Sequence, residues 1–346
     1  MERNNRLIPI LYAFVAAVFY ALNMPVSKGL LTHVAPTFMA AFLYLGAGIG
    51  MAAIYLLGGR KDHSEKLTRA DLPYTLGMIG LDIIAPILLM AGLTTATAAN
   101  ASLLNNFEIV ATSLIALALF REKVSGRLWA GILLITLSSI LLTTEGSGSL
   151  SFSTGSLLVL AATCCWGLEN NCTRRISHKN TYQIVMIKGI FSGLGSFIVA
   201  LVLREPFAPL RYVAAAMALG FVAYGLSIFF YIRAQKRLGA AKTSAYYAVA
   251  PFVGALLSLL LLREPLSRTY FAALAVMAAG SALVAVDTLL LRHTHLHTHT
   301  ITHTHNGSPH THVFTHEHGH VHMLSIDGHP HTHSEEEAHR AMTKAS

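Results

Sequence analysis

An acidic residue lies in the middle of a long apolar stretch of the chain, from Ala98 to Glu122. At about 1.5 Å rise per residue, a helix of this length spans the roughly 30 Å hydrocarbon core of a bilayer, with Glu108 near its centre. A carboxylate at that depth costs roughly 2.5 to 3.5 kcal/mol on insertion-based scales, so it should face protein or water rather than lipid. Asn105 and Thr112 share one helical face with Glu108. The pattern predicts a helix whose polar stripe faces an internal cavity.

Amide side chains near Glu108 indicate what it could do. Asn105 lies one turn earlier, and Asn23 lies in the first apolar segment. We predict that Glu108 and these two asparagines offer a charge and hydrogen bonds to a polar solute in a central cavity. Exchange of a proton on Glu108 against substrate would couple transport to the proton gradient. The alternative is a structural hydrogen bond that positions the first and fourth helices.

Two further acids fall inside apolar segments. Asp82 is nearly central in its segment, and Glu169 lies in the last turns of its own. Ionisable residues inside a membrane are functional candidates by default, so both are predicted to bind substrate. Asp82 has two alternatives, a structural pair with Lys28 or a buried, protonated acid. Glu169 could instead lie near the inner surface of the membrane. Lys188 also falls inside a segment, without an assigned role.

The composition is that of an integral membrane protein. Of the 346 residues, 53% are hydrophobic and 12% are charged, and the mean hydropathy is +0.53, outside the usual range of soluble domains. The net charge of +8 comes from basic residues at the ends of apolar segments, which argues against a nucleic-acid partner. Cys164, Cys165 and Cys172 share one apolar segment, so no disulfide framework is expected. No nucleotide-binding loop, zincin pair or nucleophile motif appears, so we predict no enzyme and no required cofactor.

Ten apolar segments separated by short polar turns predict an all-α integral membrane protein with ten transmembrane helices. With the N-terminus inside, most Lys and Arg residues fall in inner loops, and ten crossings return the C-terminus to the same side. We therefore predict a multi-pass protein of the plasma membrane, with both termini cytoplasmic and an uncleaved first helix. The segments run approximately over residues 8–30, 36–57, 72–93, 97–119, 125–143, 155–173, 181–203, 212–232, 243–262 and 267–291.

The fourth segment has a counterpart later in the chain. Residues 240–264 align with residues 98–122, and both stretches end in Arg-Glu. Repetition inside a multi-pass protein is typical of transporters built from two halves. Because each half has an odd number of helices, the second inserts upside down, which makes an inverted repeat. The predicted organisation is a first repeat at 1–145, a second at 150–291 and a tail at 292–346.

Three features carry a resemblance to a known family. In each half an aromatic-small pair is followed eight positions later by a basic residue. The fourth and ninth segments end in Arg-Glu, and a segment rich in small residues closes each half. In these features the chain resembles the EamA-domain type of the drug/metabolite transporter superfamily, which are ten-helix carriers with two inverted five-helix repeats. The first feature runs from Tyr20-Ala21 to Lys28 and from Trp166-Gly167 to Arg174.

The resemblance covers about residues 8–290 and has implications for the site. It implies that helices one, three, four, six, eight and nine line the cavity, while five and ten pack peripherally. On that basis Tyr20, Trp166 and Tyr247 are predicted cavity aromatics, with packing as the alternative. The mid-helix Glu-Pro usual in the family is reduced here to Glu108 in one copy and Pro251 in the other. The family moves amino acids, other metabolites, nucleotide derivatives and drugs, so the resemblance names no substrate.

The composition changes abruptly after Leu291. Residues 292–346 hold all but three of the 19 histidines, many alternating with threonine. Little there could form a core, so the tail is predicted to be disordered when free of ligand, although the alternation would place histidines on one side of a strand. Neutral imidazoles suit Zn, Ni, Co or Cu, and the interrupting Thr, Leu, Ile and Val argue against a cloning tag. The predicted metal ligands are His293, His295, His297, His299, His303, His305, His310, His312, His316, His318, His320 and His322.

Three functions remain open at this stage. The first is a secondary carrier that exports a small polar metabolite or a metal-chelating metabolite by alternating access, with a metal-responsive tail. The second is a direct transition-metal ion transporter. The predicted spans argue against it, because they contain no histidine and no paired acids at ligand spacing. The third is a membrane-tethered metal sensor. The predicted partners are a small-molecule substrate, the lipid bilayer and transition metals, and no oligomeric state is predicted.

Overall fold

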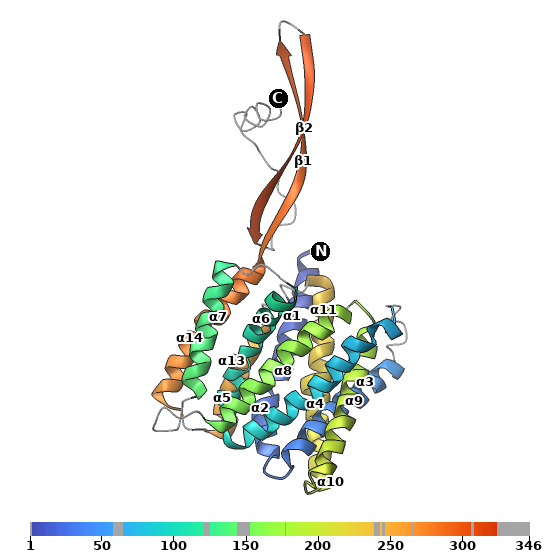
Figure 1. Cartoon of the computed structure of the whole chain (residues 1–346), viewed down its shortest axis with the longest axis vertical. Helices are drawn as coiled ribbons and strands as arrows, with labels where there is room; N and C mark the ends of the chain where they lie inside the picture. Colours follow the sequence, from blue (N-terminus) through green and yellow to red (C-terminus); the bar gives the residue numbers. More distant parts are fainter. Residues whose placement is uncertain are drawn as a thin grey trace. The chain divides into compact units, whose positions relative to one another are not determined.

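The computed structural model of the chain describes residues 2–57, 65–120, 125–143, 153–176, 178–238, 243, 246–264, 266–305 and 308–323. The chain divides into two units, Met1–Asp287 and Thr288–Ser346. The first unit is a bundle of helices, in which α3, α4, α8 and α9 lie side by side (Figure 1). The second contains two antiparallel strands.

Helices form where the sequence has apolar segments. Several of them begin with side-chain caps. For example, Thr97 accepts a hydrogen bond from the backbone N–H of Asn100, and Asn180 accepts one from that of Gln183. The described elements are α1 (Glu2–Ala21), α2 (Asn23–Leu30), α3 (Pro36–Leu57), the short 3-10 helix η2 (Arg69–Asp71), α4 (Leu72–Thr95), α5 (Ala98–Leu104), α6 (Phe107–Phe120), α7 (Gly126–Thr143), α8 (Thr154–Ile176), α9 (Thr181–Val202), α10 (Leu210–Gly220), the π-helical turn η3 (Phe221–Leu226), α11 (Ser227–Leu238), α13 (Ala250–Leu262) and α14 (Arg268–Leu289).

Many of these helices suit a bilayer. Among the described residues, seven helical stretches are long and apolar enough to cross a membrane: Ile8–Leu30, Pro36–Leu57, Arg69–Thr95, Gly126–Thr143, Thr181–Val202, Leu210–Ala234 and Arg268–Asp287. Large aliphatic side chains such as Leu133, Ile198 and Leu260 lie exposed on the outside of the bundle. Exposed apolar surface on this scale fits a lipid environment.

The stretch around Glu108 is not one continuous helix. It divides into α5 and α6, with Asn105 and Asn106 in a turn between them. Asparagine competes for backbone hydrogen bonds and favours such breaks. Glu108 therefore lies in the first turn of α6 rather than in the middle of a long helix. The prediction of a single helical stripe is wrong at this point.

Two other long helical stretches also contain an irregular turn. A turn at Leu22 separates α1 from α2, which begins at Asn23. The eighth segment contains the π-helical turn η3 between α10 and α11. Helix breaks and π turns are frequent at functional sites, because they free backbone groups and turn side chains toward a cavity.

Glycines allow the central helices to approach closely. A Cβ on Gly189 of α9 would lie 2.4 Å from the backbone nitrogen of Gly48 in α3, and one on Gly92 of α4 would lie 2.6 Å from the carbonyl oxygen of Gly155 in α8. Such contact is possible only without a side chain. It brings the middle of α9 against α3 and holds α4 beside α8.

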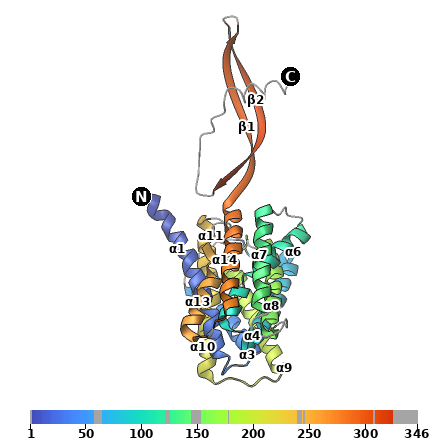
Figure 2. The same ribbon diagram turned by 90° about the vertical axis from the view of Figure 1, so that its left-hand side faces the viewer.

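Helices α7 and α14 pack together in the bundle (Figure 2). Ser138 Oγ donates a 2.6 Å hydrogen bond to the carbonyl oxygen of Ala273. A Cβ on Gly131 would lie 3.1 Å from the carbonyl oxygen of Gly280. Small residues thus join the helices that close the two halves of the sequence.

Two glutamates cap the starts of helices from across the bundle. Glu264 accepts hydrogen bonds from the backbone N–H groups of Ala98 and Ala99, at 2.9 and 3.1 Å, at the start of α5. Glu205 does the same for Thr37 and Phe38 of α3. Each follows an arginine in the left-handed region, with φ of 50° at Arg263 and 56° at Arg204. The Arg-Glu motif that supported the resemblance is therefore a helix-capping device in its second copy. Its first copy, at residues 121 and 122, lies outside the described residues.

The histidine-rich segment forms a hairpin over much of its length. Strands β1 (Leu290–His305) and β2 (Ser308–Met323) pair antiparallel along their full lengths. The prediction of disorder is therefore wrong for these residues, while residues 324–346 lie outside the described part. The alternating pattern has the period of a strand, and Thr, Val and Ile favour strands. Between the strands the sequence reads Asn306-Gly307, a dipeptide typical of two-residue hairpin turns.

Candidate functional site

A cluster of three charged side chains lies inside the helical unit. Lys188 Nζ of α9 is 3.1 Å from Asp82 Oδ2 of α4 and 3.0 Å from Glu169 Oε1 of α8. The two acid side chains are 0% and 2% exposed, and that of Lys188 is 16% exposed. Such burial makes an unpaired charge costly, so the lysine and the acids stabilise one another. The predicted site residues Asp82 and Glu169 are thus brought together through a residue without a predicted role.

Hydrogen bonds hold both acids in place. Tyr44 of α3 donates its hydroxyl to Asp82 Oδ1 at 2.9 Å. Thr173, one turn beyond Glu169, donates its hydroxyl to Glu169 Oε1. The close contact of Gly48 with Gly189 brings the Lys188 turn of α9 against the helix that carries Tyr44. The packing of the backbones therefore determines which charges meet.

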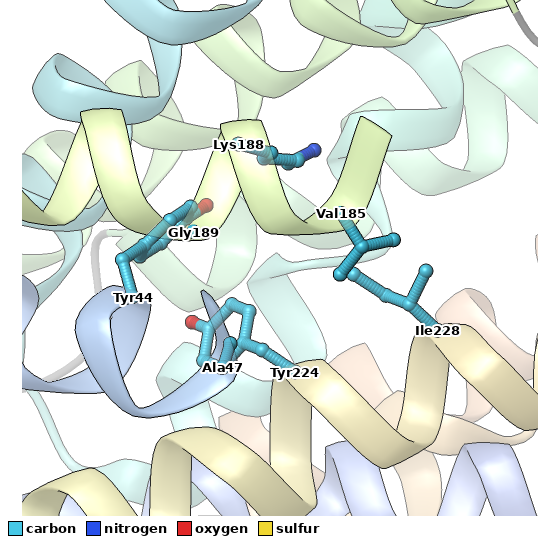
Figure 3. A pocket seen from close by; sticks show the side chains of 7 residues that line it. All are labelled: Tyr44, Ala47, Val185, Lys188, Gly189, Tyr224 and Ile228. Atoms are coloured by element: carbon cyan, nitrogen blue, oxygen red, sulfur yellow. The ribbon is translucent and has the colours of Figure 1, made fainter. Parts of the chain in front are cut away.

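A small pocket opens beside this cluster (Figure 3). Tyr44 and Ala47 reach it from α3, and Tyr224 reaches it from η3. It is also lined by Val185, Lys188, Gly189 and Ile228. The pocket has a cation and two phenol rings in an otherwise apolar wall, which suits a small polar group.

The breaks in the long helices meet one another through amide-to-phenol hydrogen bonds. Asn23, at the start of α2, donates from Nδ2 to the hydroxyl of Tyr224 in η3 at 3.0 Å. Asn105, in the turn before α6, donates from Nδ2 to the hydroxyl of Tyr20 at 2.9 Å. Both asparagines are buried. Two predicted site residues therefore stabilise interruptions of the helices, which places polar groups in the centre of the bundle.

Four tyrosines form a continuous row that runs from Asp82 to Ser227. We call Tyr44, Tyr224, Tyr20 and Tyr247 the tyrosine row. Successive ring centroids are 5.3, 6.0 and 5.9 Å apart along it. The row begins at the Asp82 hydrogen bond, and the hydroxyl of Tyr247 lies 3.4 Å from Ser227 Oγ. Tyr20 and Tyr247, predicted as cavity aromatics, thus lie in one aromatic wall.

Glu108 is hydrogen-bonded to a residue of α8. Its Oε1 accepts a 2.6 Å hydrogen bond from Asn170 Nδ2 of α8, which also lies 3.3 Å from Thr112 Oγ1. Asn105 and Asn23, predicted to contact the same solute as Glu108, donate to tyrosines. Because Asn170 is next to Glu169 in α8, Glu108 and the charged cluster are joined through one helix.

Three other residues with sequence-based expectations are Lys28, Trp166 and Glu169. Lys28 does not pair with Asp82, because its Nζ donates to the carbonyl oxygens of Leu93 and Ala96 at 2.6 and 2.8 Å, at the end of α4. This is the favoured place for a cation at a helix C-terminus. Trp166 is 6% exposed and lies in the hydrophobic core. Glu169, which could have lain near the membrane surface, is buried in the charged cluster.

A separate polar contact joins the loops before α4 and α9. Lys179 Nζ is 2.9 Å from Glu65 Oε2, and the backbone N–H of Asn180 donates to the carbonyl oxygen of Glu65 at 2.7 Å. The hydrogen bond and charge of Lys179 hold the pKa of Glu65 below its usual value. The hydrogen bond with Glu65 in turn raises the pKa of Lys179. This contact is electrostatic and lies outside the predicted spans.

Four residues of this site had no predicted role: Lys188, Tyr44, Tyr224 and Asn170. Lys188 carried the clearest signal, because a charge within an apolar span is costly unless it is paired. Tyr44 belongs to the second predicted segment and Lys188 to the seventh, neither of which the family resemblance implied as cavity-lining. Nothing in the local pattern marked either tyrosine, since aromatic residues are common in apolar spans.

An all-helical bundle with apolar outer surfaces and a buried charged centre defines a multi-pass membrane protein of the transporter type. A sequence model of the EamA-like transporter family matches residues 7–144 and again residues 153–286. The chain belongs to the EamA-like transporter family, and the resemblance found in the sequence is confirmed.

Individual proteins agree with this assignment. An uncharacterized transporter of Methanothermobacter thermautotrophicus is 29% identical over 282 residues, which are 76% of this chain and 82% of that protein. The uncharacterized transporter YyaM of Bacillus subtilis is 23% identical over 253 residues, which are 70% and 82% of the two chains. A protein of known crystal structure shares the fold, with a TM-score of 0.61 at 19% identity over 81% of this chain and 96% of its own.

Proposed function

We propose that the protein is a secondary transporter that exports a small polar solute by alternating access, with the Asp82–Lys188–Glu169 cluster at its binding site. The observation that carries this proposal is the buried cluster itself, next to three interrupted helices. Transporters bind substrates where broken helices expose polar groups near the middle of the membrane. The tyrosine row supplies an aromatic wall for the same solute.

The charge of the cluster indicates the chemistry of the solute. Among the described residues, Lys188 is the one cation paired with Asp82 and Glu169, and Glu108 adds a further carboxyl group bonded to Asn170. In a medium of low dielectric, the surplus negative charge favours a bound proton or the cationic group of a solute. We therefore infer a substrate with an amine or similar group, a class that includes metal-chelating metabolites. Exchange of that solute against a proton would couple its export to the proton gradient.

The proposed arrangement is ten spans in two inverted repeats, in the plasma membrane, with both termini cytoplasmic. Contacts between loops assigned to the same side support it. The loops before α4 and α9, both assigned to the inside, meet through Lys179 and Glu65. Ser125, also assigned to the inside, donates to Asp287 at the C-terminal end of the bundle. On the other side, the loop holding Glu264 caps α5.

A direct path for transition-metal ions is the second candidate. In its favour, the structure brings two acids together that the sequence left apart, Asp82 and Glu169. Lys188 lies between them, however, and a cation there opposes a divalent ion. Within the part of the chain whose side chains the structure describes, no group of three or more His, Cys, Asp or Glu residues is placed to hold a metal ion. A membrane-tethered sensor is the third candidate.

An untargeted comparison of metabolites tests the transport proposal. Cells producing the native protein are compared, at low and high metal, with cells producing the charge-neutral variant Asp82→Asn, Glu169→Gln, Lys188→Met. Because no charge is left unpaired, this variant should fold and reach the membrane. We expect the intracellular concentration of a small cationic metabolite to be lower in cells with the native protein than in cells with the variant. Equal profiles in native and variant cells would overturn the proposed site, and loss of every phenotype on deleting residues 293–346 would favour the sensor.

A further inference from the structure

The pairing of the two hairpin strands has a consequence for the histidines. Paired residues in β1 and β2 always combine an odd number with an even number, as in His295 with His318. In β1 the histidines fall on odd positions, and in β2 they fall on even positions. Because successive residues of a strand alternate between faces, all of these histidines belong to one face of the hairpin. We call it the histidine face. Its members are His293, His295, His297, His299, His303, His305, His310, His312, His316, His318, His320 and His322.

Several members of the histidine face are directly paired. Three successive same-face pairs are His293 with His320, His295 with His318 and His297 with His316. A fourth, His303 with His310, lies near the turn. His299 opposite Phe314, and Ile301 opposite His312, separate these two groups. The other face carries mainly threonine, with Leu296 opposite Glu317.

We propose that the three successive histidine pairs form a binding site for a transition-metal ion that requires the paired strands. Residues directly opposite in an antiparallel pair have Cβ atoms about 4.5 to 5.5 Å apart, and neighbouring same-face positions are about 7 Å apart along a strand. The register therefore places the four histidines of two adjacent pairs close together on one face. Zinc takes four ligands at about 2.0 to 2.1 Å from imidazole nitrogen, and imidazole also suits Cu, Ni and Co.

The metal also accounts for the stability of the hairpin. An isolated two-stranded hairpin is marginally stable in water, because it has no core to bury. Apolar residues such as Leu296, Val313 and Val321 are scattered along β1 and β2 and do not form a continuous apolar face. Ligation across the strands contributes binding free energy to the paired conformation alone, since an unpaired chain does not keep the imidazoles in register. Metal binding and strand pairing are therefore coupled. This inference does not depend on the proposed transport function.

The test asks whether metal affinity depends on the pairing of the strands or only on the number of histidines. The full chain is purified in detergent and titrated with Co²⁺, whose visible absorption is intense in tetrahedral sites. Zn²⁺ is then added as a competitor. In the face-changing variant, Thr294→His, His295→Thr, His297→Thr and Thr298→His move two imidazoles to the opposite face without a change of composition. In the matched control, His299→Ile and Ile301→His keep the imidazole on the histidine face, now opposite His312. Deletion of residues 292–346 gives the background from the rest of the chain.

We expect the native chain to bind Zn²⁺ and Co²⁺ well above the background of the deletion. The face-changing variant should bind at least tenfold more weakly and lose the tetrahedral absorption, while the control should bind as tightly as the native chain or more tightly. Equal binding by native, face-changing and control chains would overturn the proposal, because affinity would then follow composition alone. Native binding no greater than that of the deletion would also overturn it.

Discussion

Lys188 Nζ of α9 lies 3.1 Å from Asp82 Oδ2 of α4, inside the helical unit and with the aspartate fully buried. The same ammonium lies 3.0 Å from Glu169 of α8. One lysine therefore links α9 both to α8, its neighbour in the sequence, and to α4, which lies far from both in the sequence. The pairing decides both how the bundle is stabilised and where a solute could exchange with a buried charge.

The first prediction concerns the energetics of this pair. Lys188→Met leaves two buried carboxylates without a cation, so it should lower the free energy of unfolding by about 3 to 5 kcal/mol. Adding Asp82→Asn should recover a large part of that loss, because it removes one of the unpaired charges. Thermal unfolding in detergent is measured for the native protein, the two single variants and the double variant. The four values give the interaction free energy between Lys188 and Asp82. Strictly additive effects would show that the two side chains do not stabilise each other.

The second prediction concerns Glu108. In Glu108→Gln the side-chain oxygen can still accept the hydrogen bond from Asn170, so the variant should fold with nearly native stability. It cannot exchange a proton, however, so transport of the metabolite found by the profile comparison should lose its dependence on pH. Transport by proteoliposomes across a series of pH values provides the measurement. A native rate with native pH dependence would remove Glu108 from the coupling mechanism.

The third prediction concerns the cap on α5. Glu264→Gln removes the negative charge from the N-terminus of a buried helix, where carboxylates are worth about 0.3 to 1 kcal/mol and at most ~2 kcal/mol. The melting temperature in detergent should fall accordingly. Arg263→Gly is the matched control, because glycine adopts the left-handed backbone at φ 50° without strain. Its melting temperature should be equal or higher, and a large drop would contradict the proposed geometry of the motif.

The fourth prediction concerns the approach of α9 to α3. In Gly189→Ala the new Cβ would lie 2.4 Å from the backbone nitrogen of Gly48, so the helices must separate at a cost of about 1 to 3 kcal/mol. Transport should fall as well, because Lys188 moves with α9. Gly80→Ala, in α4 near Asp82, meets nothing within 4 Å and should be tolerated. Similar melting temperatures for the two variants would refute the role assigned to the glycine contact.

The fifth prediction concerns pH and the contact between Lys179 and Glu65. Because the pKa of Glu65 is lowered in the folded protein, its stabilising contribution is present above the unfolded pKa and is lost as pH falls through the carboxyl range. Lys179→Met should therefore reduce stability near neutral pH, by a small amount, and have less effect at acidic pH. Thermal unfolding of both chains from pH 7 down to pH 4 tests this. A difference that grows on acidification would contradict the assigned sign.

Several features were predictable because they depend on local pattern. Long apolar runs predict membrane helices, and the predicted segments 36–57 and 181–203 agree closely with α3 and α9. The interruption at Asn105 was not predicted, because a carboxylate and two asparagines in an apolar run are equally compatible with a continuous helix. The hairpin was signalled by alternation and by Asn306-Gly307, but the low apolar content outweighed that signal.

The sequence by itself determined that the protein belongs in a bilayer, that acids lie within apolar segments, and that histidines alternate in the tail, since each of these is a property of neighbouring residues. Tertiary structure decided that Asp82 and Glu169 meet at Lys188 and that Glu108 bonds to Asn170. Those pairings depend on which helices approach closely, and that is set by glycines on distant segments. In the hairpin, the strand register decided that both sets of histidines share one face. A shift of one residue would have separated them, because side chains alternate with a period of two.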